Sequence, residues 1–133
     1  MNSDISKILR ETLLDFGVPQ EKIGHFDRHS SIVLNFKTIS PIMLTADHHR
    51  VWMWSELTTL NGATLNTHAE KLLLALQHPL PSVVTGQAVL GKGLRGYEVK
   101  ALLDDMCSGS ATHLQGALDG FFRLMISLHG IFK

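Results

Sequence analysis

The spacing of apolar residues changes from helical to strand-like in the first half of the chain. In residues 5–16 they recur three and four positions apart, which indicates one face of a helix, and Gly17 with Pro19 predicts its end. The next apolar segments, "SIVLNFK" (31–37), "IMLTA" (42–46) and "VWMWSEL" (51–57), are typical of strands. Because the connections between them are short, we expect an antiparallel meander.

The second half begins with a helical pattern over residues 64–78. Thr67 and Glu70 have the spacing of a capping box, although the cap could lie earlier. Apolar residues cover more than one side of this helix, so it needs two packing partners. Strands are predicted at 87–91 and 96–103, and a last helix from about Ser110.

These elements predict an α+β fold with an antiparallel sheet, in the order α-β-β-β-α-β-β-α. At 133 residues, with 44% hydrophobic residues, we expect a single domain over 1–133. Twelve basic residues balance twelve acidic ones without forming a run, so a nucleic-acid partner is not supported. The low charged fraction of 18% favours an oligomer or a partner that covers apolar surface.

The expected location is a reducing cytoplasm. Cys107 is the one cysteine, so an internal disulfide is excluded. No apolar run approaches the ~20 residues that a membrane helix needs. The N-terminal segment carries acidic residues and has no small-residue cleavage site, so a secretory signal is not expected.

Residues 91–96 spell G-x-G-x-x-G, the pattern of a dinucleotide-binding loop. Such a site needs a helix after the glycines, whose N-terminus binds the pyrophosphate. Here "YEVKA" (97–101) predicts a strand, and no acidic residue occupies the ribose-binding position ~20 residues on. A hairpin turn is therefore favoured. A small nucleotide- or ligand-binding domain that uses Gly91–Gly96 is the alternative function.

Other site chemistry is weakly supported. The pairs His25/His29 and His48/His49 lie in expected loops or turns, so no metal site is predicted. Cys107 has no recognisable catalytic motif around it and is expected to be a loop or helix-start residue. We expect no enzymatic activity, no cofactor and no catalytic residue.

The strand "VWMWSEL" is apolar on both faces. Trp52 and Trp54 lie on one face, and Val51 and Met53 on the other, whereas a strand with one solvated face alternates apolar with polar. An ordinary central strand between helices would explain this pattern. A second subunit or a bound polypeptide is the other explanation, since Trp and Met are adaptable contact residues.

Over nearly its whole length, the chain resembles the class I chaperones of type III secretion systems, within them the multi-effector subgroup typified by invasion protein B (the SpaK family). The most specific stretches are "DRHSSIVLNF" (27–36) and "VWMWSEL" (51–57). Looser matches are "GQAVLG" (86–91), "VKALL" (99–103) and "ALDGFF" (117–122). The chain departs from the family in charge, since these chaperones are typically acidic and its pI is about 7.1.

The resemblance implies a cytoplasmic bacterial homodimer without enzymatic activity. It would bind the N-terminal segment of secreted effectors and keep them soluble until the secretion ATPase or sorting platform takes them. Effector strands would add to sheet edges while apolar side chains fill grooves. By position, effector-binding candidates are Leu13, Phe16, Val33, Asn35, Trp52 and Trp54. The second helix would form the dimer interface through Leu65, Leu72, Leu73 and Leu76.

Overall fold

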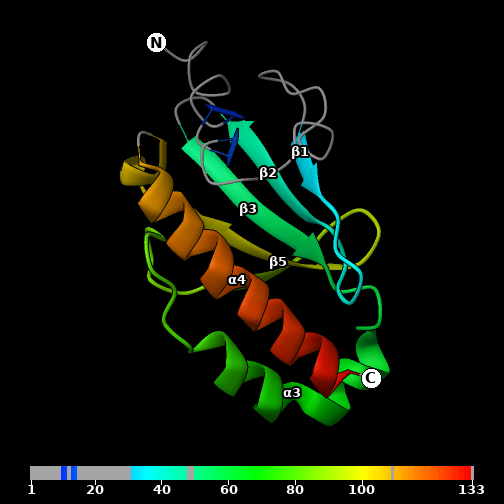
Figure 1. Cartoon of the computed structure of the whole chain (residues 1–133). Coiled ribbons are helices and arrows are strands. Elements are labelled where there is room, and N and C mark those ends of the chain that lie inside the picture. The colour runs from blue at the N-terminus through cyan, green and yellow to red at the C-terminus, as the bar shows by residue number, and fades with distance from the viewer. Residues whose placement is uncertain (1–9, 12, 15–30, 48–49, 109, 133) are drawn as a thin grey trace.

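The computed structural model describes residues 10–11, 13–14, 31–47, 50–108 and 110–132. Within these ranges it is an α+β structure, as predicted, with one antiparallel sheet of five strands and two helices (Figure 1). The elements are β1 (Ser31–Leu34), β2 (Ile42–Asp47), β3 (Arg50–Glu56), α3 (Gly62–Leu76), β4 (Val89–Lys92), β5 (Tyr97–Leu102), η2 (Asp105–Ser108) and α4 (Ala111–Ile131). Most of the predicted first helix lies outside the described residues. The four residues of that segment that the structure describes, 10, 11, 13 and 14, are helical.

The sheet has the strand order β1-β2-β3-β5-β4. The first three strands form the predicted antiparallel meander, and β3 then pairs antiparallel with β5 rather than with β4. As a result β4 lies at the edge, joined to β5 by a hairpin in which Lys92 is paired with Tyr97. β3, the tryptophan strand, is therefore the central strand of the sheet.

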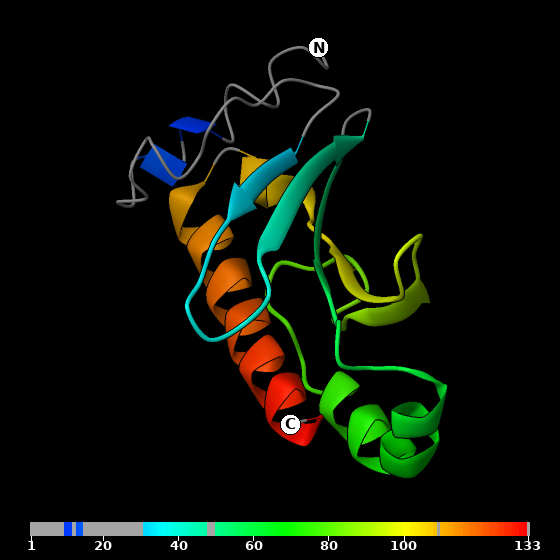
Figure 2. The same ribbon diagram turned by 90° about the vertical axis from the view of Figure 1, so that its right-hand side faces the viewer.

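The hydrophobic core lies between the sheet and α4, which crosses one face of the sheet (Figures 1 and 2). On β2 and β3 every second residue is buried, so these strands present one face to α4. The helix contributes apolar residues three and four positions apart, which form one buried stripe. Fully buried examples from the sheet and helix are Ile32, Ile42, Leu44, Met53, Val99, Leu114, Phe121, Met125 and Leu128.

Helix α3 begins earlier than the capping pattern at Thr67 and Glu70 predicts. The N-cap is Asn61, whose side-chain oxygen accepts hydrogen bonds from the backbone N–H groups of Ala63 and Thr64, each at 3.0 Å. The Thr64 hydroxyl in turn accepts from the Asn61 backbone N–H at 2.7 Å, which completes the capping box. Thr67 instead donates its hydroxyl to the Ala63 carbonyl, so it lies inside the helix.

The first strand ends at Leu34, three residues before its predicted end. Phe36 packs against Phe122 of α4, with ring centroids 4.9 Å apart. This contact draws the chain from the sheet toward α4, because an aromatic pair of this geometry adds stabilisation beyond the buried area. The β1–β2 connection is therefore in contact with the helix.

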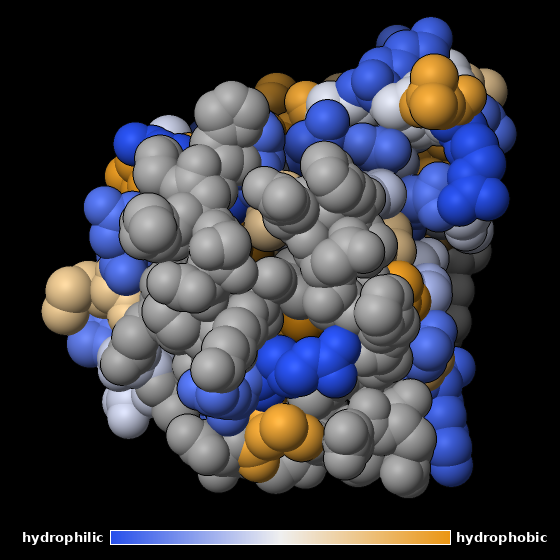
Figure 3. All heavy atoms as spheres, turned by 90° about the horizontal axis from the view of Figure 1, so that it is seen from above, coloured by the Kyte–Doolittle hydropathy of each residue, from blue (hydrophilic) through white to orange (hydrophobic). Residues whose placement is uncertain are grey.

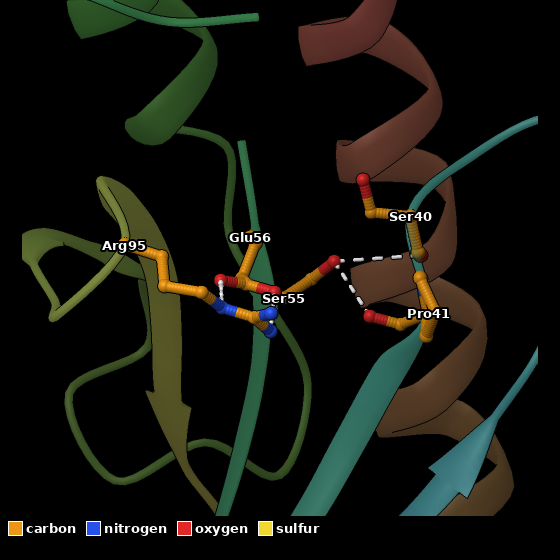
Figure 4. A network of polar contacts seen from close by, with 5 residues as sticks. All are labelled: Ser40, Pro41, Ser55, Glu56 and Arg95. Carbon is orange, nitrogen blue, oxygen red and sulfur yellow. Dashed lines mark hydrogen bonds and ion pairs between the residues drawn. The ribbon is translucent and has the colours of Figure 1, made fainter. Parts of the chain in front are cut away.

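The same connection is held by two polar contacts. Ser55 is the one buried polar residue among those described, and its hydroxyl donates to the carbonyl of Pro41 at 2.9 Å and lies 3.4 Å from that of Ser40 (Figure 4). The Ser40 backbone N–H donates to Nε2 of His129 in the last turn of α4, at 3.4 Å. A donor and an acceptor of the connection are thus satisfied by residues far apart in sequence.

Nothing among the described helices is long and apolar enough to cross a lipid bilayer.

A pH dependence of stability follows from His129. Burial lowers the pKa of this imidazole, and its Nε2 must stay unprotonated to accept from Ser40. The unfolded chain, with a His pKa of about 6.5, therefore binds the proton more readily than the folded one. We expect the contribution of His129 to be complete above about pH 6.5 and to be lost as the pH falls toward the lower folded pKa.

The variant His129→Gln tests this, because glutamine retains an acceptor and cannot titrate. Urea unfolding between pH 5 and 8 should show a shallower fall of stability for the variant than for the parent protein. Parallel pH profiles of the two proteins would contradict the assignment.

Candidate interaction surfaces

The sheet face opposite α4 carries the two tryptophans and is called the open face below. Cross-strand pairs place Val33, Met43 and Trp54 in one row across β1, β2 and β3, and Trp52 beside Leu102 in the next row. Trp52, Trp54, Met43 and Leu102 are half-buried, and Val33 is 38% exposed. No described helix packs on this face: α4 covers the other one, and α3 lies beyond the end of the sheet (Figure 2). A central strand thus presents aromatic surface that the described chain leaves partly uncovered.

The polar atom of Trp54 is satisfied within the sheet. Its Nε1–H donates to the hydroxyl of Thr45 on the neighbouring strand at 2.9 Å. A partner that covers Trp54 therefore needs to supply no acceptor, and apolar contact alone suffices. The centre of the open face is suited to bind apolar side chains.

One end of the open face is charged. Glu56 on β3 lies directly opposite Glu98 on β5, and each carboxylate has a cation beside it. Nη2 of Arg95 lies 2.8 Å from Glu56, and Nζ of Lys100 lies 3.3 Å from Glu98 (Figure 4 shows the first pair). Sequence reasoning missed this cluster, because it depends on the pairing of β3 with β5 across the helix between them.

The G-x-G-x-x-G string forms the β4–β5 hairpin, as its flanking residues predicted. The backbone N–H of Gly93 donates to the Gly96 carbonyl at 2.6 Å, and a strand follows directly at Tyr97. Gly96 has a φ of +140°, which favours glycine, and a β-carbon at Gly93 would overlap the Glu98 carboxylate. The glycines are explained by the turn, and no helix N-terminus follows them to bind a pyrophosphate.

The outer surface of α3 is a second apolar region. Leu73 and Leu74 are each 61% exposed, on a helix that also packs against α4. A hollow between the two helices is lined by Leu74, Ala75, His78, Arg123, Leu124 and Ser127. The excess of apolar residues noted in this helix is therefore real surface in the single chain.

The remaining predicted contact residues are divided between surface and core. Asn35 is exposed just after β1, while Leu65 and Leu76 are partly buried. Leu13 and Leu72 are buried in the hydrophobic core and present no surface to a partner in this structure. Phe16 lies outside the described residues. The predicted roles of all these residues remain predictions.

No metal-binding cluster occurs in the described ranges: no three His, Cys, Asp or Glu side chains gather closely enough there. The pairs His25/His29 and His48/His49 lie outside those ranges.

Cys107 lies in η2, as a loop or helix-start residue would, and is almost fully buried. Burial, with a smaller effect of Asp104, raises the pKa of its thiol to about 11, while a hydrogen bond with the Ser82 side chain acts in the opposite direction. A thiol of this kind is a poor nucleophile at neutral pH.

Among the described residues, the candidate functional features of this α+β structure are its exposed apolar surfaces and not a reactive cluster.

Comparison with known proteins shows which family the chain belongs to. The model of the invasion protein B family matches residues 17–93, more than half of the chain, so the chain belongs to that family. Two curated relatives are the surface presentation of antigens protein SpaK of Salmonella typhimurium and that of Salmonella typhi. The chain is 26% identical to each over 122 residues, which cover 92% of this chain and 90% of each relative.

The burial of Cys107 leads to a prediction about thiol reactivity. At pH 8 the native protein should react with Ellman's reagent at least 100-fold more slowly than the urea-unfolded chain, since both exposure and thiolate fraction are low. Absorbance at 412 nm follows the reaction. A native rate close to the unfolded one would contradict the assignment of Cys107 to the core.

Proposed function

We propose that this protein is a cytoplasmic, homodimeric chaperone of a bacterial type III secretion system. It binds N-terminal segments of secreted effectors and keeps them soluble and competent for export. Membership of the invasion protein B family supports the role in secretion. The observation that carries the binding function is the open face, where two half-buried tryptophans lie on the central strand without a described element over them.

The open face fits a segment of another polypeptide better than a small molecule. Its apolar side chains extend across β1, β2 and β3 as Val33, Met43 and Trp54, and reach β5 through the pair Trp52 and Leu102, whereas small-molecule sites are concave and enclosed. Aromatic residues and methionine are also enriched where proteins bind one another. An effector segment that covers Trp52 and Trp54 would bury apolar area on both partners, which stabilises the complex.

Dimerisation is assigned to the outer surface of α3. Leu73 and Leu74 lie side by side in sequence on an exposed helix, and two copies related by a two-fold axis would present the same leucines to each other. This arrangement leaves the open face of each subunit available for an effector.

No catalytic step is part of the proposal. The buried thiol of Cys107 is explained by packing, and the glycines of Gly91–Gly96 by the hairpin. No observation favours the alternative of a nucleotide-binding domain. Transfer of the effector to the secretion ATPase or sorting platform would follow chaperone binding.

The first test uses Val33→Asp on the open face. A carboxylate buried against an apolar partner without a counter-charge costs several kcal/mol, so affinity for an effector N-terminal segment should fall at least tenfold. Co-expression with effectors of the same secretion locus, then titration of the purified pair by calorimetry, measures the effect.

The matched control is Ile126→Asp, an apolar position on α4 that is 45% exposed against 38% at Val33, and this variant should bind the effector normally. Equal losses in both variants, or no loss at Val33, would contradict the assignment to the open face. Failure of every effector segment to co-purify with the parent protein would contradict the chaperone function itself.

The second test concerns the dimer. Leu73→Asp should convert a dimer of twice 14.7 kDa into a monomer, as measured by light scattering. Leu73 is 61% exposed in the single chain, so the substitution should not disturb the fold of the monomer. The thermal midpoint of the variant should therefore fall only by the amount that dimerisation contributes. Ile126→Asp adds the same charge at an exposed apolar position on α4, outside the proposed interface, and should leave the dimer intact. An unchanged mass for the Leu73 variant would refute the interface.

A further inference from the structure

Along β3, the open face changes from apolar to charged. Its successive residues on this face are Trp52, Trp54 and Glu56, which are paired on β5 with Leu102, Lys100 and Glu98. Residues two apart in a strand are about 7 Å apart, so a bound segment two or three residues long passes from one environment to the other. The open face is therefore directional.

The charged end of the open face contains two ion pairs, and therefore equal numbers of positive and negative side chains. The positive side chains are nevertheless the ones exposed to solvent. The side chains of Glu56 and Glu98 are only 19% and 14% exposed, whereas those of Arg95 and Lys100 are 80% and 37% exposed. Two carboxylates directly opposite each other repel, so each needs its cation nearby. The carboxylates are paired and little exposed in this arrangement, while the cations retain N–H donors that are accessible to a partner.

The ion pair of Lys100 and Glu98 lies against the glycine-rich hairpin. Cε of Lys100 lies 3.5 Å from where a β-carbon of Gly91 would be, which is ordinary contact, so the lysine extends over the edge strand β4. A β-carbon at Gly93 would instead overlap the Glu98 carboxylate. Gly93 of the G-x-G-x-x-G string thus leaves room for the acidic member of this pair.

We propose that Lys100 and Arg95 are specificity-determining residues that bind acidic side chains of the partner segment. An apolar stretch would cover Trp52 and Trp54, and adjoining Asp or Glu residues would contact the two cations, which sets the direction of the segment across the sheet. This inference rests on the proposed function of the open face. It explains how a chain without net charge selects a partner by charge: the selective groups are local.

An acidic protein segment suits this surface better than a lipid membrane. The cations adjoin an apolar row that crosses a sheet, and stable membrane attachment takes a larger basic cluster or an amphipathic helix. A single polypeptide segment can contact both the apolar row and the charged end, because the two are continuous on β3 and β5.

The experiment uses three synthetic peptides with one shared core, in which leucine and valine alternate with serine. A triplet of glutamates, of glutamines or of lysines follows the core. Fluorescence anisotropy with the full-length protein should show the glutamate peptide binding about tenfold more tightly than the glutamine peptide at about 50 mM salt, with the lysine peptide weakest. At about 500 mM salt most of this preference should disappear.

In Lys100→Gln with Arg95→Gln, the preference for glutamate should be lost while the glutamine peptide binds as before. Lys71→Gln, which removes an exposed cation on α3, is the control and should keep the preference. Because the double variant leaves two glutamates unpaired, Lys100→Gln with Glu98→Gln is the second test. It keeps the local charge balanced and should reduce the preference severalfold.

Equal binding of the glutamate and glutamine peptides by the parent protein would overturn this inference and leave the proposed function standing. A preference that persists in both variants would do the same. If no peptide binds at all, the open face is not the binding surface, and the inference falls together with the proposed function. Binding of phosphatidylserine vesicles that is lost in the double variant would assign the two cations to lipid instead.

Discussion

The packing of one long helix on one face of the sheet is the constraint on which the rest of this structure depends. α4 supplies an apolar stripe for a single face, and the buried residues of β2 and β3 alternate accordingly. The other face has no described helix over it, yet its central strand carries Trp52 and Trp54 rather than the polar residues expected of a solvated face. An apolar face without a described helix over it is the physical basis of the proposed binding surface.

The polar contacts of the structure maintain this one-sided arrangement. Ser55 and Glu56 are neighbours on β3 whose side chains point in opposite directions, as alternation requires (Figure 4). Ser55 fixes the β1–β2 connection on the core side, and Glu56 holds Arg95 at the hairpin. Seen from the end with the β2–β3 turn, the described residues show hydrophilic and hydrophobic atoms interspersed (Figure 3).

Much of the described fold could be predicted from residue patterns. The short apolar segment "VWMWSEL" and the helical spacing of apolar residues around Phe121 predict a strand and a helix because both patterns reflect contact with the core. Element ends were predicted less well: β1 stops early because Phe36 contacts Phe122, a contact between segments far apart in sequence. The N-cap of α3 is Asn61, earlier than the spacing of Thr67 and Glu70 predicts, because an asparagine followed by glycine is equally typical of a turn.

The candidate surfaces could be predicted only in part. Periodicity indicated which face Trp52 and Trp54 share, because strand alternation is local. It could not separate Leu72, which is buried, from Leu73, which is exposed, since both lie within the apolar arc of one helix. The charged end of the open face was beyond prediction, because the register that brings Glu56 opposite Glu98 is set by non-local pairing.

The two tryptophans of the chain both lie on the open face, so their fluorescence reports directly on its occupation. The decisive measurement adds an effector N-terminal segment that contains no tryptophan and records emission and acrylamide quenching. Coverage of the open face predicts a shift of emission to shorter wavelength and a severalfold loss of quenching as the complex forms, since the indole rings leave water. A complex detected by light scattering with unchanged emission and quenching would place the effector elsewhere and contradict the account.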